Sequence, residues 1–270
     1  MKSMYFRSIW LSDLHLGSKN VNSAYLLDFL KNTDSEYLYL VGDIIDFWEL
    51  RKKSYWPQIN NRIVRNVLRK ARTGTKVIYI PGNHDDIVRQ FDGQRLHGVT
   101  ISNEVIHSTT DGRRFLVIHG DEFDCVVRHN KWLAELGSLA YEVLLTVNGF
   151  WNRMRLKMGL SYWSLSAFLK YQVKQAVNFI GNFEKIVVAE ASRRKVDGLI
   201  CGHIHHAAIK KMDRITYNNT GDWVESCTAL AETPDGSLTI LRWTEMCAFS
   251  AAEEKKYADC YRNGRLAPTS

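Results

Sequence analysis

Five short polar motifs carry the residue types in this chain that are best suited to metal chemistry. In chain order they are Asp13-Leu14-His15, Gly42-Asp43, Gly82-Asn83-His84-Asp85, His119-Gly120-Asp121 and Gly202-His203-Ile204-His205. Carboxylate, amide and imidazole groups are ligands of Mn, Fe and Zn, and none of the motifs contributes a thiolate. Together the motifs predict a metal centre that is assembled from most of the chain.

Each motif follows an apolar run with a composition typical of β-strands. The runs cover residues 8–11, 37–41, 76–80, 115–118 and 198–201. Continuous apolar runs bounded by Gly or Pro predict strands that are buried on both faces. Side chains just past the carboxyl ends of such strands converge on one crevice of an open α/β sheet. We therefore expect the five motifs to be neighbours in space.

Helical patterns separate the first three runs, whereas turn signals dominate later. One helix is expected from Asn22 or Ser23 to near Asn32, and another from Pro57 to Gly74. Two hairpin turns are predicted at residues 111–112 and 234–236, because both contain Asp-Gly. This order of elements predicts an α/β fold with parallel or mixed sheets that antiparallel strands complete.

The segment between His119 and a helix expected near residues 182–195 shows helical patterns without strand signals. We interpret residues of about 125–180 as a helical lid inserted into a single domain that spans residues 1–270. From Cys125 to Ile180 seven basic residues accompany two acidic ones, so 7 − 2 = +5 of the net charge of +7 lies here. A basic surface beside a metal centre favours a phosphorylated substrate or an anionic membrane, and a solvated helix face is the alternative.

The composition is that of a globular protein, with 45% hydrophobic and 24% charged residues among 270. Five scattered cysteines without a Cys-x-x-Cys pair indicate reduced thiols rather than a disulfide framework or a zinc ribbon. The first residues lack the apolar stretch of a secretory signal, and Glu135 and Glu142 interrupt the longest apolar region. We therefore predict a cytoplasmic protein without a transmembrane helix.

A two-metal hydrolytic site needs a bridging carboxylate, several imidazoles, and open positions for water and a phosphoryl oxygen. The motifs can supply this set. The expected ligands of one metal are Asp13, His15, Asp43 and His205. The expected ligands of the other are Asp43, Asn83, His119 and His203. An isolated Asp-x-His occurs by chance, but five such pieces at strand ends favour the metal interpretation.

The motif set resembles the calcineurin-like metallophosphoesterase superfamily. Its pattern of D-x-H, G-D, G-N-H-D, a later His, and G-H-x-H is matched in full between Ile9 and His205. The resemblance implies a four-layer α/β/β/α sandwich and two divalent metal ions, Mn with Fe or Zn as alternatives. It also implies that a hydroxide bridging the metals attacks phosphorus. His84 would then stabilise or protonate the leaving oxygen, and Asp85 would orient His84.

Three stretches are similar to the UDP-2,3-diacylglucosamine pyrophosphatase group, namely residues 42–48, the helical insertion and residues 219–225. This resemblance implies cleavage of the diphosphate of a lipid-bearing sugar nucleotide into a 1-phosphate lipid and UMP, a step of lipid A synthesis. Arg153, Arg155 and Lys157 stand among aromatic residues of the insertion. We expect these cations to bind substrate phosphate or the anionic inner-membrane surface, whereas the aromatics either receive acyl chains or only pack the lid.

His84 is a departure from this group, because the lipid A enzymes commonly have Arg at that position. A paralogue that acts on another phosphomonoester or phosphodiester, including a nuclease, therefore stays open. No separate basic nucleic-acid domain is evident, so we expect no stable nucleic-acid partner. A non-catalytic metal-binding scaffold is the third alternative, although every motif residue is intact. Outside the motif positions, Asp46, Asp121 and Asp222 are expected either to support the site or to form turns and caps.

Overall fold

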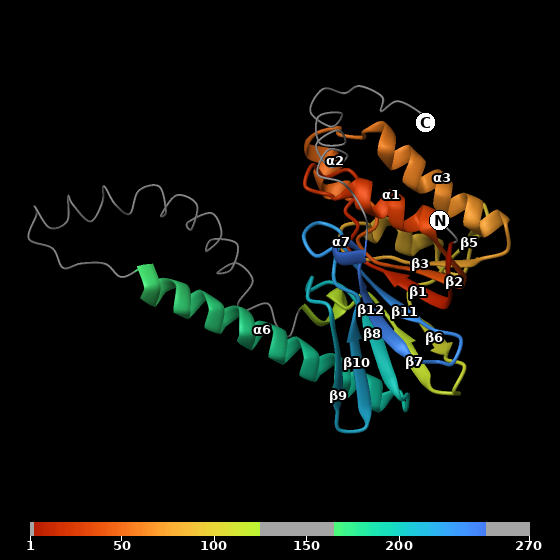
Figure 1. Cartoon of the computed structure of the whole chain (residues 1–270). Helices are drawn as coiled ribbons and strands as arrows, with labels where there is room; N and C mark the ends of the chain where they lie inside the picture. Colours follow the sequence, from red (N-terminus) through yellow and green to blue (C-terminus); the bar gives the residue numbers. More distant parts are fainter. Residues whose placement is uncertain (1–2, 125–164, 247–270) are drawn as a thin grey trace, which may run out of the picture. The chain divides into compact units, whose positions relative to one another are not determined.

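The structure, a computed structural model, describes residues 3–124 and 165–246 (Figure 1). The chain forms two compact units, one made of Met1–Asp121 with Glu190–Ser270 and the other of Glu122–Ala189. The described part of the first unit contains all five motifs.

A seven-stranded sheet is the larger of the two sheets in the first unit. In spatial order its strands are β12 (Leu238–Arg242), β11 (Thr228–Glu232), β1 (Met4–Leu11), β2 (Thr33–Val41), β3 (Lys76–Ile80), β5 (Val99–Ile101) and β4 (Arg95–Leu96). The four strands β1, β2, β3 and β5 are parallel, whereas β11, β12 and β4 pair in the antiparallel sense. The predicted turn at residues 234–236 is confirmed, since it joins β11 to β12.

The second sheet has five strands. Their order is β6 (Val105–Ser108), β7 (Arg114–Val117), β8 (Gly198–Cys201), β10 (Ile215–Asn219) and β9 (Ala208–Met212). The central strands β7, β8 and β10 are parallel, and β6 and β9 pair with them in the antiparallel sense at the edges. The predicted turn at residues 111–112 joins β6 to β7 and is likewise confirmed.

The two sheets share an apolar core. Trp10, Tyr39 and Ile80 of the larger sheet form one buried cluster with Phe115 and Ile200 of the smaller sheet. A second cluster joins the larger sheet to helices α1 (Ser23–Asn32) and α3 (Gln58–Arg72). Figure 1 shows both helices running along that sheet. The expected α/β sandwich is thus confirmed, and both helices lie within the ranges predicted from the sequence.

A buried polar network connects the two sheets. Glu232 on β11 and His107 on β6 approach to 2.9 Å between Oε2 and Nε2, and His107 Nδ1 lies 2.9 Å from the Tyr39 hydroxyl. Ser8 Oγ donates to Glu232 at 2.6 Å, and Arg7 Nη1 donates to its other oxygen at 2.8 Å. Burial would raise the pKa of Glu232, but the hydrogen bonds led by His107 and Ser8 lower it to about 2.

Short helices and one long helix complete the described chain. The short ones are α2 (Phe47–Lys52), η1 (Asp86–Phe91), η2 (Asp121–Phe123) and α7 (Trp243–Met246). The long helix α6 (Leu165–Arg193) begins well before residue 182, where a helix was expected, so part of it falls within the predicted insertion. Among the described helices none is both long and apolar enough to cross a membrane. The expected substrate-binding residues Arg153, Arg155 and Lys157 lie outside the described residues.

Candidate metal centre

Each motif occupies the loop at the carboxyl end of a parallel strand, as expected. The loops follow β1, β2 and β3 of the larger sheet and β7 and β8 of the smaller one. Backbone hydrogen bonds connect neighbouring loops, because Asp13 N donates to Gly42 O at 3.0 Å and His15 N to Asp43 O at 2.8 Å. Gly202 N donates to His119 O at 3.2 Å across the smaller sheet. The sheets therefore position side chains that are up to 192 residues apart in sequence (205 − 13).

The backbone of these loops adopts a conformation that residues other than glycine rarely take. A positive φ occurs at Asp13 (53°), His15 (46°), Asp43 (54°), His203 (71°) and His205 (53°). Such a conformation costs on the order of 1–3 kcal/mol per residue and is concentrated at functional sites. Five of the seven expected metal ligands share it, which indicates that the fold holds these side chains in place against local preference.

Glycines in the same motifs leave room for the ligands. A Cβ at Gly82 would lie 2.6 Å from His119 Cδ2, closer than real Cβ contacts allow. A Cβ at Gly42 would overlap the imidazole of His119, and one at Gly202 would overlap the carboxylate of Asp13. The glycines that precede the motif acids and histidines are thus required by close packing around the ligand atoms.

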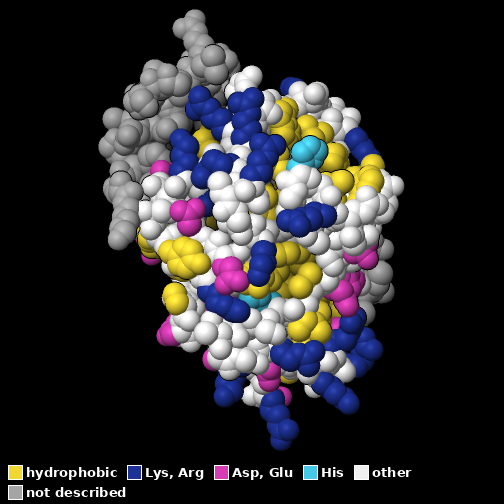
Figure 2. Space-filling model, turned by 90° about the vertical axis from the view of Figure 1, so that its right-hand side faces the viewer, with side chains coloured by type: hydrophobic (Ala, Val, Ile, Leu, Met, Phe, Trp, Pro, Cys, Tyr) yellow, Lys and Arg dark blue, Asp and Glu magenta, His cyan; other side chains and the backbone are white. Residues whose placement is uncertain are grey.

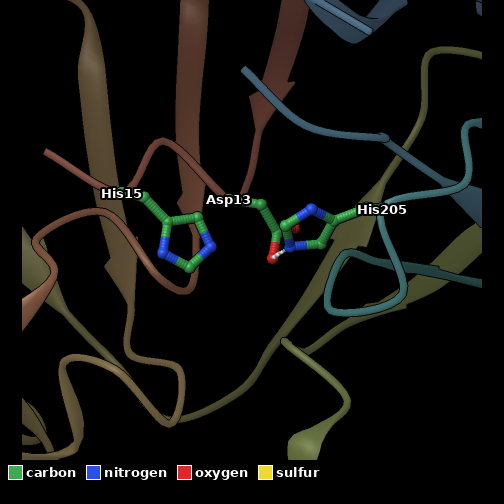
Figure 3. Close-up of side chains that lie close together, drawn as sticks. All are labelled: Asp13, His15 and His205. Carbon is green, nitrogen blue, oxygen red and sulfur yellow. Dashed lines mark ion pairs between the residues drawn. The ribbon is translucent and has the colours of Figure 1, made fainter. Parts of the chain in front are cut away.

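The first cluster of ligand atoms consists of Asp13, His15 and His205, with one ligand atom of each within 4.8 Å of the others. Figure 3 shows these three side chains converging from two loops, with an ion pair of 3.2 Å between His205 Nε2 and Asp13 Oδ1. Asp13 is fully buried, whereas the side chain of His205 is 39% exposed. Solvent or a substrate can therefore reach this cluster from the side of His205.

The second cluster consists of Asp43, His119 and His203, again with ligand atoms within 4.8 Å of one another. His119 Nε2 lies 3.4 Å from Asp43 Oδ2. The same Asp43 oxygen lies 3.9 Å from His15 Nε2, which belongs to the first cluster. Asp43 therefore lies where a carboxylate that bridges two metal ions is needed.

Several buried ligand atoms make no hydrogen bond, although two of them lie in the ion pairs described above. These atoms are Asp13 Oδ1, His15 Nε2, Asn83 Oδ1 and His119 Nε2. A buried polar atom without a partner costs about 1–3 kcal/mol, so a concentration of them indicates a missing binding partner. Divalent metal ions would satisfy all four atoms. The residues fit two such ions, and donors of this kind suit Mn, Fe and Zn alike.

The charges of the second cluster are strongly coupled. Burial would lower the pKa of His119, but the nearby carboxylate of Asp43 raises it to about 10. Burial likewise works against ionisation of Asp43, yet the charge of His119 brings the pKa of Asp43 well below its ordinary value. The two shifts favour a proton on His119 beside an ionised Asp43, and a metal cation held by these residues would compete with that proton.

Asp46, rather than Asp85, orients the imidazole of His84. Asp46 Oδ1 lies 3.0 Å from His84 Nδ1, and Asp46 Oδ2 lies 3.2 Å from His15 Nδ1. Asp46 also accepts a hydrogen bond from Glu49 N at 2.9 Å, which caps α2. The single carboxylate therefore serves both as a cap and as the support of two imidazoles. The spacing of Asp46 three residues after Asp43 was the available signal in the sequence.

Asp85 has a structural role that was not expected. Its carboxylate accepts hydrogen bonds from Gly82 N at 2.6 Å and from Ile44 N at 2.8 Å, and also from the hydroxyl of Tyr79. Both oxygens are thus occupied by the loops after β2 and β3, and no hydrogen bond to the His84 ring is recorded among the described contacts. The direct hydrogen bond to the His84 ring comes from Asp46, and Asp85 acts on that ring only through its charge. Spacing alone did not show which of the two carboxylates faces the ring.

Trp48 and Asp222 lie near the same site. The indole of Trp48 packs against the imidazole of His84 with ring centroids 4.1 Å apart, and Trp48 is 43% exposed. Asp222 accepts backbone hydrogen bonds from Val224 at 2.8 Å and from Glu225 at 2.6 Å. Of the two roles expected for Asp222, the structure thus shows the turn.

Comparison with known proteins decides the family. A model of the calcineurin-like phosphoesterases matches residues 6–207, a span that contains every motif. The chain belongs to the calcineurin-like phosphoesterase family. The phosphoesterase is therefore a hydrolase. The family implies divalent metal ions, and the clusters of ligand atoms described above are able to hold them.

Curated relatives of the phosphoesterase carry a common name. A UDP-2,3-diacylglucosamine hydrolase of Vibrio vulnificus is 24% identical, over 85% of this chain and 95% of the relative. One of Xanthomonas campestris is 26% identical, over 85% of this chain and 96% of the relative. Among solved structures, a phosphoesterase from E. coli is 12% identical with a TM-score of 0.40, covering 87% of this chain and 98% of that one. The two curated relatives confirm the resemblance to the UDP-2,3-diacylglucosamine group.

One face of the phosphoesterase carries more basic than acidic side chains. Figure 2 shows one face on which Lys and Arg side chains predominate over acidic ones and surround apolar patches. The net charge of the chain is +7. A positive surface raises the local concentration of phosphorylated substrates.

Proposed function

We propose that the chain is a Mn-dependent hydrolase that cleaves the diphosphate of UDP-2,3-diacylglucosamine, or of a similar lipid-bearing sugar nucleotide, and releases UMP. The observation that carries this proposal is the position of Asp43 Oδ2, 3.4 Å from His119 Nε2 and 3.9 Å from His15 Nε2, between two clusters of ligand atoms. The names of the relatives support the substrate. We further propose that the enzyme works in the cytoplasm, at the inner-membrane surface where such a lipid would reside.

The chain offers a separate ligand set for each of two metal ions. Asp13, His15 and His205 would hold one ion, while Asn83, His119 and His203 would hold the other, and Asp43 would contact both. Bound divalent ions supply a hydroxide at neutral pH and polarise the phosphoryl oxygens. The positive φ of five ligands and the close packing at the motif glycines hold the donors in place before the ions bind.

His84 is suited to assist the leaving group. Asp46 holds its Nδ1, and its Nε2 lies 4.0 Å from Asp43 Oδ2, so the ring presents Nε2 toward the ligand clusters. Burial would lower the pKa of His84, but the hydrogen bond that its Nδ1 donates to Asp46 raises it above the ordinary value. A protonated Nε2 can donate to the oxygen that leaves phosphorus. We assign this role to His84.

The insertion is proposed to select the substrate. Arg153, Arg155 and Lys157 lie outside the described residues, so their contribution rests on the charge pattern of the sequence. If they bind the phosphate of the lipid substrate, their neutralisation lowers turnover of the lipid more than that of a simple phosphodiester. Equal relative rates after neutralisation would show that the insertion does not discriminate.

A substrate panel tests the proposed function. The Mn-loaded protein is offered UDP-2,3-diacylglucosamine, a simple nucleotide, bis(p-nitrophenyl) phosphate and DNA, and release of UMP or phosphate is measured. UMP release is expected to be fastest from the lipid nucleotide and to disappear in Asp43→Ala. Asp86→Asn is the matched control, because Asp86 is an exposed acid next to the same motif. Cleavage of only phosphodiesters or DNA would instead favour the alternative raised by His84, a paralogue that acts on another phosphoester.

A further inference from the structure

The stretch of chain around α3 carries only positive charge. Residues 50–84 contain nine Lys and Arg residues and no Asp or Glu, which gives 9 − 0 = +9. The whole chain carries +7, so the other residues together carry 7 − 9 = −2. This stretch is therefore the main source of positive charge in the first unit, and it is more basic than the insertion.

Four of these cations form a single row on the solvent side of α3. The spacing of three, four and three residues keeps them on one side of an α-helix, and they are Arg62, Arg65, Arg69 and Arg72. The buried residues of the helix repeat at the same intervals on the opposite side, and they are Asn60, Ile63, Val67 and Lys70. Ten residues of α-helix rise by about 15 Å, so this arginine row presents an extended positive edge.

The arginine row is not neutralised by acidic side chains. Within the ranges 3–124 and 165–246, its four members make no ion pair, and Arg69 Nη2 donates only to the amide oxygen of Asn66, at 3.3 Å. Asp34 senses the charge of Arg69, but Lys70 Nζ already holds Asp34 at 3.0 Å. The last three arginines of the row are exposed, so their charge is directed to solvent.

An exposed aromatic ring and further cations precede the arginine row. Trp56 is 36% exposed, and its Nε1 donates to Asn61 Oδ1 at 2.9 Å. Arg51 and Lys53 are exposed in the segment between α2 and α3. Tryptophan beside basic residues is the combination that settles at the headgroup level of a bilayer. Nucleic acid is the other polyanion that fits the charge, but the acyl chains of the proposed substrate favour a lipid surface.

One end of α3 lies on the same side of the larger sheet as the metal centre. The helix follows β2 and precedes β3, and these strands are parallel neighbours, so α3 runs back from the carboxyl end of β2. Figure 1 shows α3 running away from α2, the helix that Asp46 caps beside His84. A surface that contacts α3 therefore extends toward the loops that carry the ligands.

We propose that the arginine row is a docking surface for the anionic headgroups of a lipid bilayer. The inference rests on the proposed function, because a substrate with acyl chains would be met at such a surface. It assigns the contact to α3 rather than to the insertion. Each basic residue near an anionic bilayer strengthens binding roughly fivefold.

Sedimentation with lipid vesicles tests the arginine row on the full chain loaded with Mn. One set of vesicles contains phosphatidylcholine alone, and the other contains equal amounts of phosphatidylcholine and phosphatidylglycerol. The wild type is expected to bind the anionic vesicles and to be released by added salt, which screens the charges. The triple variant Arg65→Gln, Arg69→Gln, Arg72→Gln is expected to bind on the order of 100-fold more weakly. Gln has nearly the helix propensity of Arg, so α3 should be retained.

A second triple variant with the same loss of charge is the matched control. Its substitutions, Lys195→Gln, Lys211→Gln and Arg214→Gln, change exposed residues next to or within strands of the smaller sheet. This variant is expected to bind anionic vesicles nearly as tightly as the wild type. Should the α3 variant fail to fold, the single substitution Arg69→Gln decides, with an expected loss of roughly fivefold.

Three results would overturn the proposal. They are equal binding of the wild type to both kinds of vesicle, no binding to either, and equal affinity of the two triple variants for anionic vesicles. A DNA duplex is titrated in parallel. Binding of DNA without binding of vesicles would assign the arginine row to nucleic acid instead.

UMP release separates failure of this proposal from failure of the proposed function. The α3 variant is expected to turn over UDP-2,3-diacylglucosamine at the wild-type rate in neutral detergent micelles and more slowly in anionic vesicles. Absence of UMP release by the wild type in both would overturn the proposed function, while vesicle binding still tests the arginine row. Wild-type turnover and wild-type binding of the α3 variant in vesicles would overturn only the arginine row.

Discussion

Replacement of Asp46 by Asn tests whether one carboxylate supports two imidazoles. Its oxygens lie 3.2 Å from His15 Nδ1 and 3.0 Å from His84 Nδ1. An Asn side chain keeps one acceptor oxygen and places an amide NH₂ where the second oxygen was. It can therefore accept a hydrogen bond from only one of the two imidazoles. Asn is also a good N-cap residue, and α2 therefore keeps its acceptor for Glu49 N. The substitution thus removes the charge and one acceptor with little other change.

The expected magnitude follows from these contacts. A hydrogen bond to a charged group contributes about 1.5–3 kcal/mol, and loss of the partner of a metal-bound imidazole lowers metal affinity or activity about 10–100-fold. The Asp46 side chain is only 4% exposed, so solvent screens the interaction little. We expect kcat to fall on the order of 100-fold and Mn affinity on the order of tenfold. UMP release at saturating Mn measures kcat, and calorimetry on the metal-free protein measures the affinity.

Asp222→Asn is the control for this experiment. Asp222 is buried near the same site, but its recorded hydrogen bonds go to the backbone of its own turn and to Ser226. The variant is expected to lose less kcat and Mn affinity than Asp46→Asn, because Asp222 makes no hydrogen bond to a ligand imidazole and acts on His205 only through its charge. The reasoning would be refuted if Asp46→Asn kept the kcat and the Mn affinity of the wild type. It would also be refuted if Asp46→Asn and Asp222→Asn lost these quantities equally.

Two further predictions concern packing and pH. Gly82→Ala is expected to abolish Mn binding, measured by calorimetry, because the added Cβ would displace Asp43 and His119. The control Gly181→Ala should leave Mn binding intact, because a Cβ at Gly181 meets nothing within 4 Å. Equal Mn binding by both variants would contradict the packing argument. The pKa of Glu232 falls from 4.5 to about 2 on folding, so its ionisation stabilises the fold above pH 4.5 and this contribution is lost as the pH falls toward 2. Glu232→Gln lacks this contribution. The difference in unfolding free energy between the wild type and this variant, measured by urea titration, should therefore decrease by about 3 kcal/mol as the pH falls from 4.5 to 2. A constant difference would show that Glu232 does not titrate as inferred.

The position of the motifs at strand ends was predictable because each apolar run in the sequence ends abruptly at a polar motif. A buried parallel strand needs an apolar run, and its carboxyl end opens onto the crevice, so Asp13, Asp43 and His119 could be placed together from the sequence. Helices α1 and α3 were predictable because the spacing of their apolar residues is a local signal, as are Asn22, Pro57 and Gly74 beside their ends.

Other features depend on contacts that no local pattern contains. The positive φ at Asp13 and Asp43 results from packing of neighbouring loops, and residue type alone does not indicate it. The ion pair of Arg89 with Asp121 joins residues 32 positions apart. Whether Asp46 or Asp85 faces His84 is decided by how the loops after β2 and β3 meet. The sequence predicted helices in the insertion and near residues 182–195, but it did not show that residues 165–193 form one continuous helix.

The number of Mn ions bound per chain is the most direct test of the central claim. Metal-free protein is equilibrated with Mn, unbound metal is removed, and the content is measured by mass spectrometry for the wild type and for Asp43→Ala. A two-metal site that shares Asp43 predicts about two ions in the wild type and fewer in the variant. A single ion in the wild type, or two ions retained in Asp43→Ala, would contradict it.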